Sequence, residues 1–233
     1  MLEDNAQSKG NPEWGYKLDF SPSPSAVLHA FCGEHTIHGA NCPNCNKPLL
    51  RLLSLNAADR VLNLDAARHP RVHLLYCWTC SIPYGEFSYR IGRDGSVTVL
   101  SVPPRKPDSE FGPEGPYDGY TGIFRRAEVA LEPLSENEQQ ILEARHPADG
   151  EEPEEPYFGH QVGGYPLIYN PSKAFWPDCS TEMPLLASIC NDAAGNNPFN
   201  DQEAETFTGN GGVQMVFHFC RACSIVTAYH SCD

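Results

Sequence analysis

Two Cys-x-x-Cys pairs constrain this chain more than any other feature of its sequence. They are Cys42-Pro43-Asn44-Cys45 and Cys77-Trp78-Thr79-Cys80. An apolar run, 48–55, follows the first pair, and another, 72–76, leads into the second, so each pair borders an expected strand. If the two strands pair antiparallel, the start of the first lies beside the end of the second. The four sulfur atoms then meet at one point.

Zinc suits such a site, because it binds four thiolates tetrahedrally at about 2.3 Å and adds folding free energy on the order of 10 kcal/mol. We therefore predict a structural zinc ion on Cys42, Cys45, Cys77 and Cys80, with no position left for a substrate. The alternative is two unligated thiol pairs or redox disulfides. A thioredoxin-like pair would open a helix, whereas Pro48 after the first pair breaks one.

The same order of features recurs later in the chain. A first copy runs over 35–90, from His35 through both cysteine pairs and their apolar runs. A second copy begins at His160 and ends on Cys220-Arg221-Ala222-Cys223-Ser224-Ile225. The ordered set of features predicts an internal duplication. The alternative is two unrelated strand-rich segments.

The second copy lacks one cysteine, because Trp176 stands where the first copy has Cys42. Three aligned thiols remain, and with zinc they would need a fourth ligand. The three thiols are Cys179, Cys220 and Cys223, and the candidates for the fourth position are His160, Cys190, His230 and Cys232. The alternative is a vestigial site in which Trp176 fills the space and the thiols are buried as small hydrophobic groups.

The remaining apolar runs are short and bounded by Gly, Asn and Pro, which favours strands over helices. Runs 87–91 and 97–102, joined through Asp94-Gly95, predict a hairpin. We expect a mainly β fold (α+β with few helices) made of two duplicated β-rich lobes, each with a zinc-ribbon-like cysteine arrangement that is degenerate in the second. The expected parts are an N-terminal extension at 1–31, lobes at 32–102 and 158–233, and a connecting segment at 103–157.

The connecting segment is rich in proline and acidic residues, so little sheet is expected there. One short helix is predicted at 139–145, because Ser135 and Glu138 form a capping box and Pro147 stops the helix. Outside the metal sites, we interpret His73 and His218 as hydrogen-bonded structural histidines within strands.

The formal net charge is −14, from 30 acidic and 16 basic side chains. Such a charge opposes binding to nucleic acid or anionic lipid and favours a basic protein partner. No run approaches the 18 or more apolar residues of a membrane span, and the N-terminus lacks the pattern of a signal peptide. We therefore expect a cytoplasmic protein, where ten cysteines are not a disulfide framework.

The segment His160-Gln161-Val162-Gly163-Gly164-Tyr165-Pro166, followed by Cys179 and Met183-Pro184-Leu185-Leu186, resembles a known family. It is similar to the Gly-Gly-x-Pro segment shared by YwqG-like domains and the programmed cell death protein 2 family. The likeness covers 159–233 best and the first copy more loosely. For the second family, the resemblance implies zinc-binding cysteine pairs and escort of a basic ribosomal protein. Two departures are Trp176, in place of a cysteine, and the missing acidic residues of the C-terminal YwqG-like strands.

Three classes of function are compatible with the sequence. The first is a non-enzymatic zinc protein that binds a basic partner, either as a chaperone that escorts a ribosomal protein or as an immunity protein that neutralises a toxin. The second is a zinc-ribbon protein that binds nucleic acid, which the charge disfavours. The third is an uncharacterised enzyme, for which we find no paired nucleophile and base and no open metal position.

Overall fold

The computed structural model describes residues 15–77, 86–102, 126–144, 159–164, 168, 175, 178–190 and 213–232. Within these residues eleven strands and two short helices are defined. The strands are β1 (Gly15–Asp19), β2 (His29–Phe31), β3 (Leu50–Asn56), β4 (Arg71–Tyr76), β5 (Phe87–Ile91), β6 (Val97–Ser101), β7 (Ala127–Pro133), β8 (Gln161–Gly163), β9 (Leu185–Cys190), β10 (Val213–Cys220) and β11 (Ile225–Cys232). The helices are the 3-10 turn η1 (Arg60–Leu62) and α2 (Glu136–Ala144).

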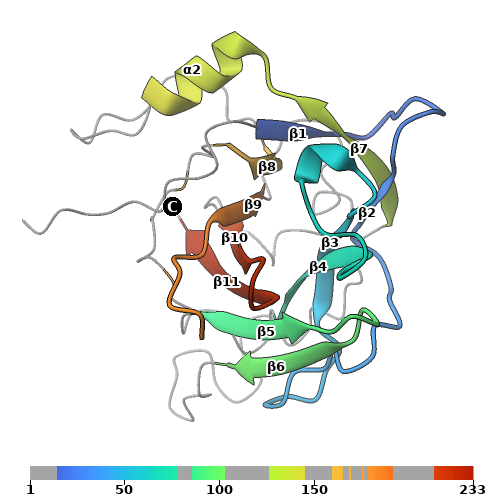
Figure 1. The fold of residues 1–233 in the computed structure, drawn as a ribbon, viewed down its shortest axis with the longest axis vertical. Helices are drawn as coiled ribbons and strands as arrows, with labels where there is room; N and C mark the ends of the chain where they lie inside the picture. The colour runs from blue at the N-terminus through green and yellow to red at the C-terminus, as the bar shows by residue number, and fades with distance from the viewer. Residues whose placement is uncertain are drawn as a thin grey trace, which may run out of the picture.

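All eleven strands belong to one sheet, in the order β4-β3-β2-β7-β1-β8-β9-β10-β11-β5-β6. The paired neighbours are antiparallel, and the mainly β fold class is confirmed. The sheet curls, so that its edge strand β4 returns to β5 and β11 (Figure 1). Tyr89 of β5 donates a hydrogen bond to the carbonyl of His73 at 2.7 Å, and Tyr76 Oη lies 3.1 Å from His230 Nδ1 of β11.

The curl encloses one main core. Its members come from both stretches of the chain that the sequence presents as copies, including fully buried Phe31, Tyr76, Tyr89 and Phe217. The two stretches therefore share one continuous sheet. Among the described residues, no helix combines the length and the apolar character needed to cross a membrane.

The unit β2-β3-β4 and the unit β8-β9-β10 have the same hydrogen-bond register. The matched pairs are Ala30↔Ser54 with Gln161↔Ser188, and Leu53↔Leu74 with Ala187↔Phe217. In both units the ladder skips one residue near the start of the middle strand, Leu52 in β3 and Leu186 in β9. A bulge at the same place re-aims the strand in the same way. Three strands of each stretch thus share a register, but they lie in one continuous sheet and not in two separate lobes.

In each unit a buried histidine accepts a hydrogen bond from the backbone at the end of the middle strand. His29 Nδ1 accepts a hydrogen bond from the backbone N–H of Asn56, at the end of β3, at 3.0 Å. His160 Nδ1 accepts from the N–H of Cys190, at the end of β9, at 3.2 Å. The expected match of His35 with His160 is therefore wrong, and His29 is the counterpart. His35 instead contacts the carbonyl of Leu49, which lies ahead of β3.

The segments outside the expected lobes contribute more sheet than the sequence predicted. β7 lies inside the proline-rich connecting segment, yet it pairs with β1 and β2 in the middle of the sheet. The expectation of little sheet in 103–157 is wrong because its prolines lie mostly outside the Ala127–Pro133 run. β1 and β2 likewise lie within the expected N-terminal extension. The first 14 residues are outside the described part of the chain.

Two local predictions are confirmed. Glu138 N–H donates to Ser135 Oγ at 3.2 Å and Ser135 N–H to Glu138 Oε2 at 2.6 Å, so the capping box starts α2, three residues earlier than expected. β5 and β6 form the predicted hairpin, with Gly95 at φ +80° in its turn. Positive φ is a conformation that glycine adopts without a steric penalty.

Candidate metal centres

The first cysteine cluster lies where β3 begins and β4 ends. Cys42 and Cys45 precede β3, Cys77 directly follows β4, and their Sγ atoms lie within 4.8 Å of one another. Cys45 Sγ and Cys77 Sγ are 3.7 Å apart. Tetrahedral thiolates at about 2.3 Å from zinc are about 3.8 Å from each other, so the cluster can hold a metal ion. The predicted fourth ligand, Cys80, lies outside the described residues.

A tight turn brings the first two sulfur atoms together. The N–H of Asn46 donates to the carbonyl of Cys42 at 2.8 Å, and Asn46 has a left-handed φ of +57°. The N–H of Cys42 in turn donates to the carbonyl of Lys47 at 2.9 Å. Because the backbone folds back directly after Cys45, both side chains of the pair point to the same side of the loop.

The second cluster repeats this arrangement at the start of β9 and the end of β10. The Sγ atoms of Cys179, Cys220 and Cys223 lie within 4.8 Å of one another, with 3.5 Å between Cys179 and Cys220. The N–H of Ser224, at φ +60°, donates to the carbonyl of Cys220 at 2.8 Å. Ser180 follows Cys179 at φ +55°, as Asn46 follows Cys45. The second cluster can therefore also hold a metal ion.

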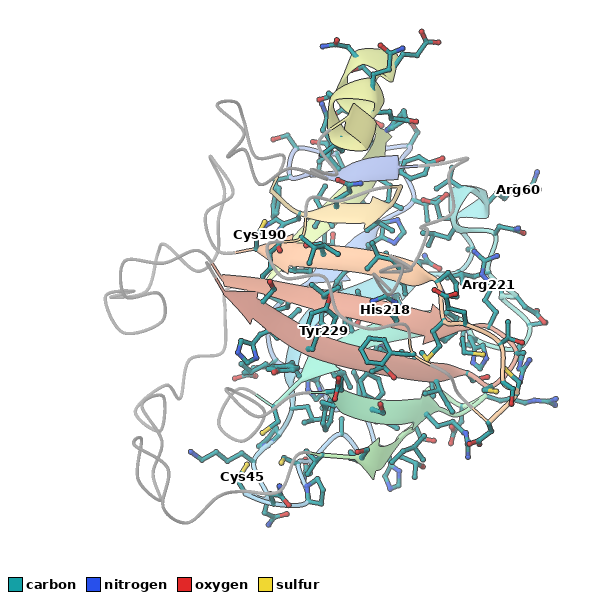
Figure 2. The ribbon with its side chains drawn as sticks, turned by 90° about the vertical axis from the view of Figure 1, so that its left-hand side faces the viewer. Cys45, Arg60, Cys190, His218, Arg221 and Tyr229 are labelled. Atoms are coloured by element: carbon teal, nitrogen blue, oxygen red, sulfur yellow. The ribbon has the colours of Figure 1, made fainter. Side chains whose placement is uncertain are left out.

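The clusters differ in exposure and lie far apart. In the first, Cys42 and Cys77 are buried and Cys45 is half-buried. In the second, only Cys220 is buried, whereas Cys179 is exposed. Figure 2 shows Cys45 and Arg221, which mark the two clusters, on different sides of the molecule. Each cluster is thus an independent centre.

Residues of the loop between β3 and β4 hold the second cluster in place. Arg68 donates to the carbonyls of Arg221 at 3.2 Å and Ala222 at 2.6 Å, both between the two cysteines of the turn. Arg221 donates to the carbonyl of Leu62 at 3.3 Å, and His69 Nε2 lies 2.7 Å from Ser224 Oγ. These residues could not be predicted from the sequence, because a contact between segments this far apart has no local signature.

In each cluster the pKa of one thiol is lowered. The thiol of Cys77 donates to Cys42 and lowers the Cys42 pKa to about 7, while the same interaction raises the Cys77 pKa. The N–H of Thr181, followed by the Cys223 thiol, lowers the Cys179 pKa to about 7, and burial raises the Cys223 pKa to about 11. Such a thiolate accepts hydrogen bonds from the neighbouring thiols. A metal cation can bind the same sulfur atoms when these thiols lose their protons.

The four residues considered as a fourth ligand of the second centre lie at the wrong end of the strands. Cys220 ends β10 and pairs with the start of β11, whereas Val213, at the opposite end of β10, pairs with Cys232. Strands rise about 3.3 Å per residue, so these ends are separated by about 23 Å. The ladder places His230 opposite Met215 and Cys190 opposite Gln214, and His160 binds Cys190. Figure 2 shows Cys190 and Arg221 at opposite ends.

The two histidines expected to be structural are hydrogen-bonded within the sheet. His73 Nδ1 lies 2.8 Å from Ser54 Oγ, and His218 Nδ1 lies 3.1 Å from the carbonyl of Met183. Both rings are buried, and desolvation lowers the pKa of each to about 4. They are therefore neutral at physiological pH and contribute to the packing of the sheet.

Comparisons with protein-family models, with curated proteins and with solved structures find no match to this chain.

Proposed function

We propose that this chain is a non-enzymatic zinc protein that binds a basic protein partner in the cytoplasm. The observation that carries the proposal is the combination of two thiolate clusters with a formal net charge of −14. The metal would stabilise the ends of the strands, and the acidic surface would recognise the partner.

Zinc is the metal that best fits the donor set. Each cluster consists of cysteine sulfur, and the 3.5 and 3.7 Å separations are those of a small tetrahedral ion. Thiolate ligands favour zinc, copper(I) and iron–sulfur clusters, and zinc takes four of them without redox chemistry. With Cys80 as fourth ligand, the first centre would be closed and structural.

Exposed acidic residues gather where β7 leads into α2, a region that we call the β7–α2 face. Glu132 of β7 and Glu136 of α2 are exposed, and Lys17 is a nearby counter-charge, 3.5 Å from Glu132 and 3.2 Å from Glu138. More acidic residues follow in the sequence at 151–155. Figure 1 shows α2 at the margin of the molecule, beside β1. An acidic surface accelerates association with a basic partner and makes it sensitive to salt.

The resemblance to YwqG-like and programmed cell death protein 2 proteins supports an escort role, with a ribosomal protein as the partner. An immunity protein that neutralises a basic toxin would use the same surface chemistry. The identity of the captured partner distinguishes these two forms.

The experiment is a pull-down from the native host with the tagged, zinc-loaded protein, after nuclease treatment, at low and high salt. We expect a basic protein that is retained at low salt and lost at high salt. The double variant E132K/E136K should reduce retention strongly. E34K/E86K, with the same change of net charge at two other exposed sites, should reduce it less. Recovery of nucleic acid in untreated samples, with no protein after nuclease treatment, would contradict the proposal.

A further inference from the structure

The second centre lacks the residue that corresponds to Cys42. Cys45 and Cys179 are equivalent, because each is followed by a residue with a left-handed backbone conformation. Each also lies nine positions before a serine, Ser54 for Cys45 and Ser188 for Cys179, and the two serines occupy the same position in the strand ladder. The residue three positions before Cys45 is Cys42, whereas the residue three positions before Cys179 is Trp176. An indole N–H is a hydrogen-bond donor and offers no lone pair to a metal.

None of the described cysteines outside the two clusters can replace the missing one. Cys190 and Cys232 are at the far ends of β9 and β11. Cys32 is buried beside β3, with its thiol 3.7 Å from the carbonyl of Leu52. The nearest histidine along β10 is His218, whose Nδ1 contacts the carbonyl of Met183. Its ring packs 4.9 Å from that of Phe175, and it is not part of the described sulfur cluster.

We propose that the second centre binds zinc through Cys179, Cys220 and Cys223 and takes its fourth ligand from outside the chain, as the thiolate of a small molecule. The proposal rests on the zinc binding proposed above. The exposure of Cys179 supports it, because an outside ligand must be able to reach the ion. In the first centre, by contrast, Cys42 and Cys77 are buried and Cys45 is half-buried, so an outside ligand has less access to its ion.

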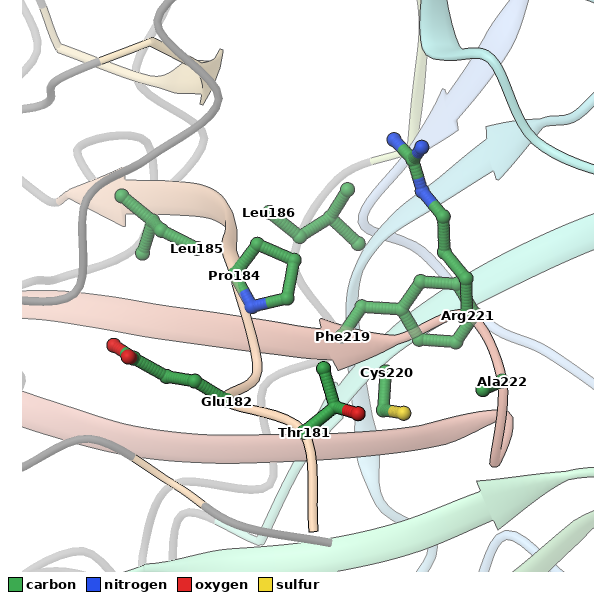
Figure 3. A pocket seen from close by; sticks show the side chains of 9 residues that line it. All are labelled: Thr181, Glu182, Pro184, Leu185, Leu186, Phe219, Cys220, Arg221 and Ala222. Atoms are coloured by element: carbon green, nitrogen blue, oxygen red, sulfur yellow. The ribbon is translucent and has the colours of Figure 1, made fainter. Parts of the chain in front are cut away.

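A pocket of about 390 Å³ borders this centre and has room for the rest of the ligand (Figure 3). Its volume lies near the lower end of the range for small-molecule sites. Cys220 forms part of the wall, Leu186 and Phe219 add apolar surface, and Glu182 and Arg221 contribute opposite charges. These neighbours suit a thiol with a short apolar stem.

The binding step is a ligand exchange with no change of oxidation state. The incoming thiol loses its proton to solvent, its sulfur forms a bond to zinc, and the water in the fourth position leaves. Zinc with three thiolates carries a net charge of −1, and the fourth thiolate makes it −2. Three thiolates already make the ion a soft acceptor, which favours sulfur over oxygen as the fourth ligand.

The test replaces zinc with cobalt(II) in the full chain, because the visible absorption of cobalt depends on the number of thiolate ligands. We expect two cobalt ions per chain, one with four sulfur ligands and one with three. Titration with N-acetylcysteine should convert the second spectrum to that of a four-sulfur site, whereas N-acetylserine should leave it unchanged. C179S should lose one cobalt ion and the response to the thiol.

The variant W176C restores the missing cysteine. We expect it to bind two cobalt ions with four sulfur ligands each, to ignore added thiol, and to release the second ion to a chelator at least about tenfold more slowly than the wild type.

Three results would overturn the proposal. One cobalt ion per wild-type chain would identify the second cluster as vestigial and leave the first centre and the proposed function intact. Two ions without any response to N-acetylcysteine would assign the fourth position to a side chain of the protein, with His218 the first to substitute. A response only to a cysteine of a bound partner protein would exclude the small-molecule thiol.

Discussion

Arg68 Nη2 lies 2.6 Å from the carbonyl oxygen of Ala222, a residue 154 positions away in the sequence. The same guanidinium binds the carbonyl of Arg221 at 3.2 Å, so one side chain of the β3–β4 loop holds the turn that carries Cys220 and Cys223. The second centre is therefore supported by a part of the chain that belongs to the first unit.

Replacement of Arg68 with alanine should weaken the second centre selectively. The loss of two hydrogen bonds from a charged, partly exposed group should cost about 1–2 kcal/mol. We expect the melting temperature to fall by about 2–8 °C and the zinc of the second centre to reach a chelator faster. Arg60→Ala is the control, since no hydrogen bond or ion pair of its side chain is seen in the described structure. Equal effects in the two variants would contradict the role of Arg68.

Replacement of Cys77 with serine should abolish the first centre. Removal of one of four thiolates from a closed site costs most of the metal affinity, and with it much of the stability that the metal adds. We expect one zinc ion fewer per chain, insoluble protein and no cooperative melting. Cys32→Ala, which removes a buried thiol outside both clusters, should keep the zinc content of the wild type. Soluble, cooperatively melting Cys77→Ser protein would argue against a structural metal.

Gly39 and Gly95 allow a matched test of how the first cysteine loop packs on β6. Both have positive φ, +78° and +80°, so alanine should cost roughly 1 kcal/mol of backbone strain at either position. A Cβ at Gly39 would lie 2.1 Å from the carbonyl oxygen of Val97, whereas at Gly95 the nearest atom is His73 Nε2 at 3.8 Å. Urea unfolding should therefore show Gly39→Ala to be less stable than Gly95→Ala by about 2 kcal/mol or more. Equal stabilities would contradict this packing.

The buried His160 should make the protein less stable in acid. Desolvation lowers its pKa to about 3 in the folded state, against about 6.5 when unfolded. As the pH falls below about 6.5 the unfolded chain binds a proton that the folded chain does not, so this group removes about 1.4 kcal/mol of stability per pH unit. The loss continues until the pH reaches the folded pKa.

The variant His160→Asn isolates this contribution. Its Oδ1 can still accept the N–H of Cys190, but it does not titrate. Urea unfolding at pH 7.5, 6.0 and 5.0 should show a shallower pH dependence for the variant, by one proton, while acid effects on the thiolates cancel in the comparison. Parallel curves would show that His160 is not neutral in the folded protein.

The sequence predicted the elements that depend on local chemistry. The cysteine pairs, the β5–β6 hairpin and the capping box at Ser135 each have a signature within a few residues. The structure contains the hairpin and the capping box, and it brings Cys42, Cys45 and Cys77 together. The repeat also led to the two units with the same register, although the match of His35 was shifted by six positions from His29. A short pattern of His and Gly occurs often by chance. Only the hydrogen bond to the end of the middle strand identifies His29 as the counterpart of His160.

The global arrangement could not be predicted in this way. β7 was missed because prolines surround it, and its role in the sheet depends on contacts with β1 and β2 that are distant in the sequence. Likewise, nothing near Cys220 predicts which end of the sheet His160 and His230 occupy. The pairing of the strands determines these positions, and it places all four expected candidates for the fourth ligand far from Cys220.

Native mass spectrometry of the protein, purified without chelators or added metal, tests the existence of the two metal centres most directly. We expect a chain with two bound zinc ions, both released in acid to leave a chain with reduced cysteines. A metal-free mass under native conditions, or a chain with disulfide bonds between these cysteines, would contradict the account.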